Sequence, residues 1–176
     1  MAATAALTEV IERFAIRDQI ENYSDALNHR DWDRSGNKLC EDLVWNIAAS
    51  FSTRVTSRDR FVELCKTQQE PVYNFVFQMA HGIVVHEIVG NMARARHTMH
   101  ELSSDFMMIG IYYDELRKGK DGVWRYRCRE FSPTYVENSR APGKIYRCLP
   151  DPSYRTVDAP APQSGLEYGQ AGLRAE

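Results

Sequence analysis

The spacing of apolar residues changes once along this chain, and that change limits the folds it can adopt. In the N-terminal third, apolar residues recur every three or four positions, as on a helix. Beyond residue 80 they alternate with polar residues, as on strands. Helices therefore come first and strands follow, joined by hairpin-type turns. This order predicts an α+β fold in which helices cover one face of a mainly antiparallel sheet. The helical stripes are Leu7, Val10, Ile11, Phe14 and then Ile16, Ile20, Tyr23, Leu27.

These two stripes lie on roughly opposite faces of one helix, because a helix turns every 3.6 residues. Either the helix breaks near Ala15 or both of its sides are covered, and we favour a break. Residues 30–33 then end the helix or begin a short second one. A further helix is expected near residue 56, where Thr56 and Asp59 have capping-box spacing.

Four strands are expected in the second half of the chain, over residues 81–89, 92–102, 106–116 and 123–131. Gly90-Asn91 is a turn signal between the first two strands, and residues 119–122 form a Gly-rich turn before the last one.

The charge and the cysteines exclude several classes of protein. Lysine and arginine total 22 and acidic residues 24, a net charge of −2, so no basic field favours nucleic acid or an anionic membrane. No apolar run is long enough to span a bilayer and no secretory signal is evident, so a soluble, cytoplasmic protein is expected. The four cysteines are far apart in sequence, which favours free thiols over a zinc site.

The chain divides into a folded domain and a tail. Residues 1–149 are expected to form one domain. Residues 150–176 hold four of the seven prolines and few aliphatic residues, so they read as a Pro/Gly-rich tail. The tail is either mobile or laid over a partner subunit.

Alternation along residues 92–102 predicts which side chains face the core. Ala93, Ala95, His97, Met99 and Glu101 form the set with the small and apolar members, so we assign it inward. His97 and Glu101 are then polar groups on an apolar face, where a buried charge is costly unless it has a partner or a function. Two interpretations stay open: a functional pair, or a rim carboxylate and a hydrogen-bonded histidine.

Four blocks of sequence resemble one known family. They are residues 14–33, the LVWN segment at 43–46, QMAHGIVVHEI at 78–88, and residues 112–131. Together they are similar to the SnoaL-like branch of the nuclear transport factor two-like superfamily, over about residues 7–135. This resemblance implies a cone-shaped α+β barrel with a pocket in the cone. Members include scytalone dehydratase, bile-acid dehydratase, ketosteroid isomerase and the small subunit of ring-hydroxylating dioxygenases.

The resemblance also implies candidate site residues. His81 matches the histidine of the dehydratase-type members, and Asn28 stands where those members have an aspartate, so it is expected to hold the His81 ring by a hydrogen bond. Tyr23 matches a pocket tyrosine, and Glu101 falls near an acidic residue of the bile-acid enzyme. Asp25 and Asp31 are each three residues from Asn28, so either could lie near it on the helix surface. Asp25 is the expected substitute for the missing aspartate, because it lies deeper in the helix.

Two functions follow from this resemblance. The first is a cofactor-free, metal-free lyase or isomerase that moves a proton on a small, mostly apolar cyclic molecule. Its catalytic residues would be His81, Asp25, Glu101 and Tyr23, and its substrate contacts Asn28, His97, Trp45 and Met99. The alternative is a non-catalytic ligand-binding or assembly subunit, such as the dioxygenase small subunit. Outward apolar residues, Ile88 and Leu102 among them, predict a homodimer or homotrimer packed through the sheet.

Overall fold

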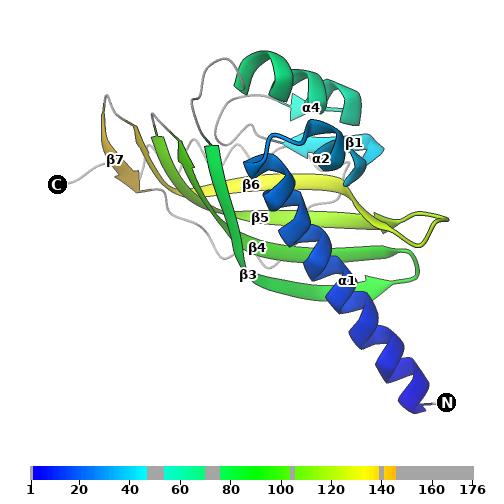
Figure 1. Cartoon of the computed structure of the whole chain (residues 1–176). Helices are drawn as coiled ribbons and strands as arrows, with labels where there is room; N and C mark the ends of the chain where they lie inside the picture. Colours follow the sequence, from blue (N-terminus) through cyan, green and yellow to red (C-terminus); the bar gives the residue numbers. More distant parts are fainter. Residues whose placement is uncertain (1, 47–53, 70–75, 104–105, 139–140, 146–176) are drawn as a thin grey trace.

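The computed structural model describes residues 2–46, 54–69, 76–103, 106–138 and 141–145. The predicted tail, residues 150–176, lies outside these residues. Helices precede the long strands, as the spacing predicts (Figure 1). In chain order the elements are α1 (Ala2–Asn28), α2 (Trp32–Asn37), β1 (Leu39–Asn46), β2 (Arg54–Val55), α4 (Arg58–Leu64), the π-helical turn η1 (Cys65–Gln69), β3 (Val76–Val89), β4 (Met92–Ser103), β5 (Phe106–Lys118), β6 (Trp124–Asn138) and β7 (Ala141–Ile145).

The strands form one mixed sheet that does not close on itself. It has seven strands in the order β2-β1-β6-β5-β4-β3, with β7 added to β6. All described pairs are antiparallel except β1 with β6, which is parallel. Gly90 has a φ of 60° in the β3–β4 turn, a backbone conformation that glycine adopts at no steric cost. The expected α+β class and the cone-shaped arrangement are confirmed, with α1 lying across the sheet (Figure 1).

Helix α1 is continuous, so the expected break near Ala15 is wrong. Its 27 residues contain neither proline nor glycine, and nothing in the backbone interrupts the helix. The second apolar stripe is buried against the sheet. The first stripe is exposed instead, because the N-terminal end of α1 extends past the sheet edge (Figure 1). Exposed fractions in this stripe are 60% for Leu7, 63% for Val10, 57% for Ile11 and 71% for Phe14.

Polar contacts hold the N-terminal half of α1 in place. Glu12 accepts hydrogen bonds from Trp124 Nε1 at 2.7 Å and from Lys118 Nζ at 2.5 Å. On the β3 side, Arg13 Nη1 donates to the Val85 carbonyl and Arg17 Nη1 to the Ile83 carbonyl. Because β3 is the last strand in the sheet order, these side chains satisfy backbone groups of an edge strand.

The short helices begin at capping residues. Asp31 caps α2 by accepting from Arg34 N, which identifies residues 30–33 as the start of a second helix. Ser57, rather than the expected Thr56, caps α4 by accepting from Arg60 N. The spacing argument placed this start one residue too early, because Ser57 also carries a hydroxyl that can serve as the cap.

Strand β3 changes register twice, between His81 and Val84 and between Val85 and Glu87. Each irregularity alters which side chains point inward. Ile88 therefore lies opposite the buried Ala93 and packs against the core, so its expected outward position is wrong. Leu102 is outward and 37% exposed, as predicted.

Within the described residues, no helix has both the length and the apolar character needed to cross a membrane. Cys40, Cys65 and Cys128 are free thiols, as expected, and the first two are buried.

Gly110 lies where β5 approaches β6 closely. A Cβ atom at this position would stand 2.3 Å from Phe131 Cζ and 2.6 Å from the Ser132 carbonyl oxygen. Because one of these atoms belongs to the backbone, the two strands would have to separate. We expect Gly110→Ala to lower the free energy of unfolding by at least about 2 kcal/mol in urea denaturation. An unchanged unfolding midpoint would contradict this close approach.

Candidate active site

The inner face of β4 carries the predicted inward set of side chains. His97 and Glu101 are 2% and 8% exposed, so both polar members are buried rather than placed at a solvated rim. The alternation-based assignment is therefore confirmed for this strand. The apolar members of the set are Ala93, Ala95 and Met99, each 2% exposed or less.

Glu101 is a buried carboxyl group with one described hydrogen-bonding partner. Gln78 lies directly opposite on β3, and its Nε2 donates to Glu101 Oε2. Burial raises the pKa of Glu101 to about 7, although the Gln78 hydrogen bond opposes this shift. A carboxyl group of this kind can take up and release a proton near neutral pH.

Asn28, at the end of α1, contacts the backbone of β3 and not a histidine. Its Nδ2 donates to the Gln78 carbonyl at 2.8 Å, and its Oδ1 accepts from Gln78 N at 2.6 Å. Both ends of the side-chain amide are thus used by one residue. The expected hydrogen bond from Asn28 to the His81 ring is not formed.

His81 lies on the opposite face of the sheet from Glu101. Between Gln78 and His81 the pairing with β4 keeps its register, so strand alternation turns His81 outward. Its side chain is exposed, and its ring lies 4.4 Å from that of His100. The structure therefore separates His81 from the other candidate residues, and His97 is the histidine that lies in the interior.

His97 belongs to a buried ionic cluster with Asp114 and Arg129. His97 Nδ1 is 3.2 Å from one carboxylate oxygen of Asp114, and Arg129 Nε donates to the other at 2.8 Å. Burial lowers the pKa of His97, against the opposing effect of Asp114, so the imidazole is neutral at pH 7. Burial alone would raise the pKa of Asp114, but Arg129 and His97 together hold it below its ordinary value.

Aromatic rings surround the Arg129 guanidinium. Its central carbon lies 4.0 Å from the ring centroid of Tyr126, 4.1 Å from Tyr112, 4.7 Å from Tyr23 and 5.4 Å from Trp45. Such contacts stabilise a buried cation. Among the described residues, the Tyr23 hydroxyl and Trp45 Nε1 have no hydrogen-bonding partner. Burial raises the pKa of Tyr23 well above its ordinary value, so its hydroxyl remains a donor.

Five of the predicted site residues are buried in this interior: Tyr23, Trp45, His97, Met99 and Glu101. Arg129 and Asp114 are buried there too and were not predicted. The short turn between the 106–116 and 123–131 segments indicates that they pair, but it does not set Asp114 opposite Arg129. That pairing depends on a register shift between Glu115 and Leu116, which the sequence pattern does not reveal.

Asp25 lies outside this interior. Its carboxylate pairs with Arg34 at 2.6 Å and with His29 at 3.3 Å, and half of its side chain is exposed. Two residues along a helix correspond to a rotation of about 200°, so Asp25 faces away when Tyr23 faces the core.

We expect Asn28→Asp to destabilise the protein rather than to restore a histidine–aspartate pair. A carboxylate cannot donate to the Gln78 carbonyl and would stand against it, leaving one part-buried acceptor unsatisfied. The free energy of unfolding at pH 7 should fall by about 1–3 kcal/mol in urea denaturation. A more stable Asn28→Asp variant would contradict this geometry.

Comparison with known proteins identifies the fold. Residues 8–130 match the SnoaL-like domain family, which is more than half of the chain. The chain belongs to the SnoaL-like domain family. No curated protein sequence matches this SnoaL-like chain significantly.

Solved structures with the same fold include three that resemble the SnoaL-like chain over most of its length. A type 2 hexachlorocyclohexane dehydrochlorinase has a TM-score of 0.68 at 15% identity, covering 82% of this chain and 98% of its own. A candidate scytalone dehydratase from Novosphingobium aromaticivorans has a TM-score of 0.65 at 19% identity, covering 88% and 99%. A candidate aromatic ring hydroxylase from the same organism has a TM-score of 0.67 at 18% identity, covering 74% and 94%. At these identities the likeness establishes the fold.

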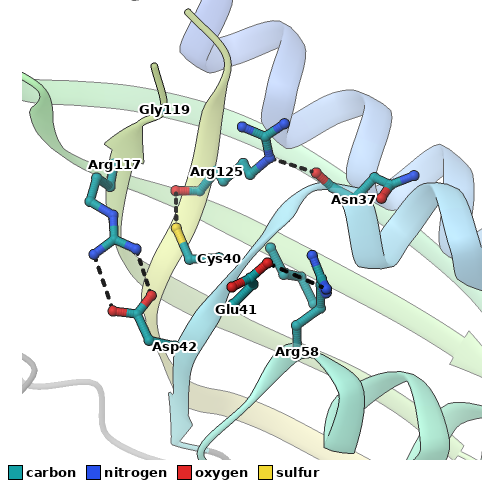
Figure 2. A pocket seen from close by; sticks show the side chains of 9 residues that line it. Asn37, Cys40, Glu41, Asp42, Arg58, Arg117, Gly119 and Arg125 are labelled. Atoms are coloured by element: carbon teal, nitrogen blue, oxygen red, sulfur yellow. Dashed lines mark hydrogen bonds and ion pairs between the residues drawn. The ribbon is translucent and has the colours of Figure 1, made fainter. Parts of the chain in front are cut away.

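A concave region of the SnoaL-like domain lies apart from these residues. It is a pocket of about 420 Å³ between β1, the start of α4 and the β5–β6 turn (Figure 2). Arg117 forms two hydrogen bonds to Asp42, Arg125 donates to the Asn37 carbonyl, and Arg58 lies 3.9 Å from Glu41. Because each of these arginines already has an acidic partner, which for Arg125 is Asp121, we place the candidate site at the inner face of the sheet. Within the described ranges, no cluster of three or more His, Cys, Asp or Glu side chains could hold a metal ion.

Proposed function

We propose that this protein is a cofactor-free lyase or isomerase that moves a proton on a small, mostly apolar cyclic molecule at the inner face of the sheet. The observation that carries the proposal is Glu101, a carboxyl group buried on an apolar face with an amide as its described partner. A buried ionisable group without an opposing charge is costly to keep, and such groups are found mostly where chemistry requires them.

In this proposal Glu101 takes a proton from a carbon of the substrate. In an isomerisation it returns the proton at another position. In an elimination the electrons of the broken C–H bond form a C=C bond as hydroxide or halide departs, and the proton leaves with that group as water or acid. The role expected of His81 therefore passes to Glu101. Tyr23 supplies a hydroxyl donor to the oxygen on which negative charge develops, a contribution that is often large. His97 is a second, neutral polar contact.

The apolar part of the substrate would be contacted by Trp45 and Met99. These side chains are 4% and 1% exposed, and Met99 lies between His97 and Glu101 on the inner face of β4. They would fit the shape of the apolar substrate and exclude water, and the resulting low dielectric strengthens every polar contact inside the site.

The test is a screen of hydroxylated cyclic compounds, halogenated cyclic compounds and Δ-ketosteroids with the purified full chain. Turnover of one class is expected, with a pH–rate profile that has a limb near pH 7 because Glu101 must be in the correct protonation state. Tight binding of a panel compound without any turnover would contradict catalysis and favour a ligand-binding role.

A second candidate function is that of an assembly subunit. It is favoured by the fold shared with a candidate aromatic ring hydroxylase and by the large apolar side chains on the outside of the domain. On the outer face of β3, Phe77 is 46% exposed and Met79 37%.

Mass measurement separates these outcomes. A homodimer or homotrimer packed through the sheet accords with the lyase or isomerase. Co-purification with a larger redox subunit supports the assembly role, and a monomer at micromolar concentration contradicts both forms of association.

A further inference from the structure

A chain of side-chain amides links the end of α1 to Glu101. The Asn28 side chain forms hydrogen bonds with the backbone N–H and C=O of Gln78. The Gln78 side-chain amide in turn donates to Glu101 on the neighbouring strand β4. Asn28 and Gln78 are 50 positions apart in the chain, so this connection exists only in the folded protein.

We infer that Gln78 is a positioning residue that orients the Glu101 carboxyl group and balances its two protonation states, and that Asn28 holds Gln78 in place to do so. The inference rests on the proposed function only for its catalytic consequence. The ionisation of Glu101 can be measured without any substrate.

Burial and the hydrogen bond from Gln78 act in opposite directions on the ionisation of Glu101. Burial disfavours the charged carboxylate, whereas the Nε2–H donor of Gln78 favours it because a carboxylate accepts more strongly than a carboxylic acid. A neutral amide adds this donor without adding a charge. A lysine or arginine in the same place would keep the carboxylate ionised, and an apolar residue would keep it protonated.

Among the described residues, the other groups that interact with Glu101 do not supply a competing positive charge. The Cys65 thiol of η1 and the Tyr112 phenol of β5 interact with Glu101, and burial raises the pKa of each, so both are neutral at pH 7. His97, two residues away on the same face of β4, is neutral as well. Gln78 is therefore the described group best placed to control Glu101.

The test is a pH titration of the Glu101 carboxyl carbon by ¹³C NMR in the full chain, with the signal assigned by its loss in Glu101→Gln. Gln78→Met keeps the length of the side chain and removes the donor. We expect the proton affinity of Glu101 to rise about tenfold or more in this variant. Asn28→Ala should shift the midpoint in the same direction by a smaller factor, because Gln78 is then less firmly held.

Gln19→Met is the matched control. Gln19 is a buried glutamine whose Nε2, like that of the half-buried Gln78, donates a hydrogen bond. Its acceptor is the Lys38 carbonyl, and it has no contact with Glu101 among the described interactions. This variant should leave the Glu101 midpoint unchanged. If Gln78→Met fails to fold, Gln78→Asn gives the same readout, because its shorter amide does not reach Glu101.

The inference is overturned if the Glu101 midpoint is the same in the wild type and in Gln78→Met, or if Gln19→Met moves it equally. Failure of the proposed function looks different. If the Glu101 midpoint shifts in Gln78→Met but the protein turns over no compound, Gln78 positions Glu101 and the proposed catalysis is wrong. If Glu101→Gln loses turnover but the midpoint does not move in Gln78→Met, Glu101 is catalytic and the positioning role of Gln78 is wrong.

Discussion

Replacing Glu101 with glutamine is expected to lower turnover at least about 100-fold, the usual contribution of a general acid–base group. The same change is expected to make the protein more stable above pH 7. Glutamine has nearly the same shape as glutamate but cannot accept the proton. Turnover at saturating substrate and the urea unfolding midpoint are the two measurements.

The stability effect follows from the pKa of Glu101, which burial raises from 4.5 to about 7. Below pH 4.5 the group is protonated in both the folded and the unfolded chain, so it costs nothing. As the pH rises from 4.5 to 7 the unfolded chain loses its proton first, and the folded state becomes progressively less stable. The full penalty is on the order of 3 kcal/mol and is present above pH 7.

Glu101→Gln removes this penalty, so its advantage over the wild type should grow between pH 4.5 and 7 and then level off. Two variants serve as controls. Glu21→Gln makes the same substitution at an exposed site on α1, and His81→Ala removes the outward histidine, so both should retain activity. Loss of turnover in His81→Ala, with Glu101→Gln active, would return the proton-transfer role to His81.

Replacing Asp114 with asparagine is expected to cause the largest loss of stability among single changes at this site. Asp114 is the carboxylate that neutralises Arg129, and both side chains are 1% exposed or less. An asparagine would leave the guanidinium buried without a counter-charge, which costs about 3–5 kcal/mol. The melting temperature at pH 7 should fall on the order of 10 °C for a domain of this size.

Acid should reproduce part of this loss in the wild type. Because the folded protein holds the pKa of Asp114 below its ordinary value of 3.8, its contribution is present above that pH and disappears as the pH falls below it. Asp25→Asn is the matched control. Its pair with Arg34 is half exposed, so the change in unfolding free energy should stay below about 1 kcal/mol. Equal effects of the two variants would show that burial of the Asp114 pair does not matter.

The local sequence pattern was sufficient to predict features that depend only on neighbouring residues, such as the direction of side chains along a strand and the positions of turns. Strand alternation is a property of the extended backbone, so the inward set on β4 from Ala93 to Glu101 followed from the order of residues alone. The sequence also predicts the turns at Gly90 and before Trp124. The resemblance to the SnoaL-like family over about residues 7–135 agrees with the family match over residues 8–130.

Tertiary structure decided the rest, because those features depend on contacts between distant segments. Which of the two apolar stripes of α1 is covered depends on how far the sheet extends beneath the helix. The position of Ile88 depends on two register shifts that alternation does not reveal, and the direction of His81 depends on where those shifts begin. Asn28 was expected to hydrogen-bond the His81 ring, but the fold places it beside the backbone of Gln78. The N–H and C=O of Gln78 pair with both ends of the Asn28 amide, which an imidazole cannot do in the same way.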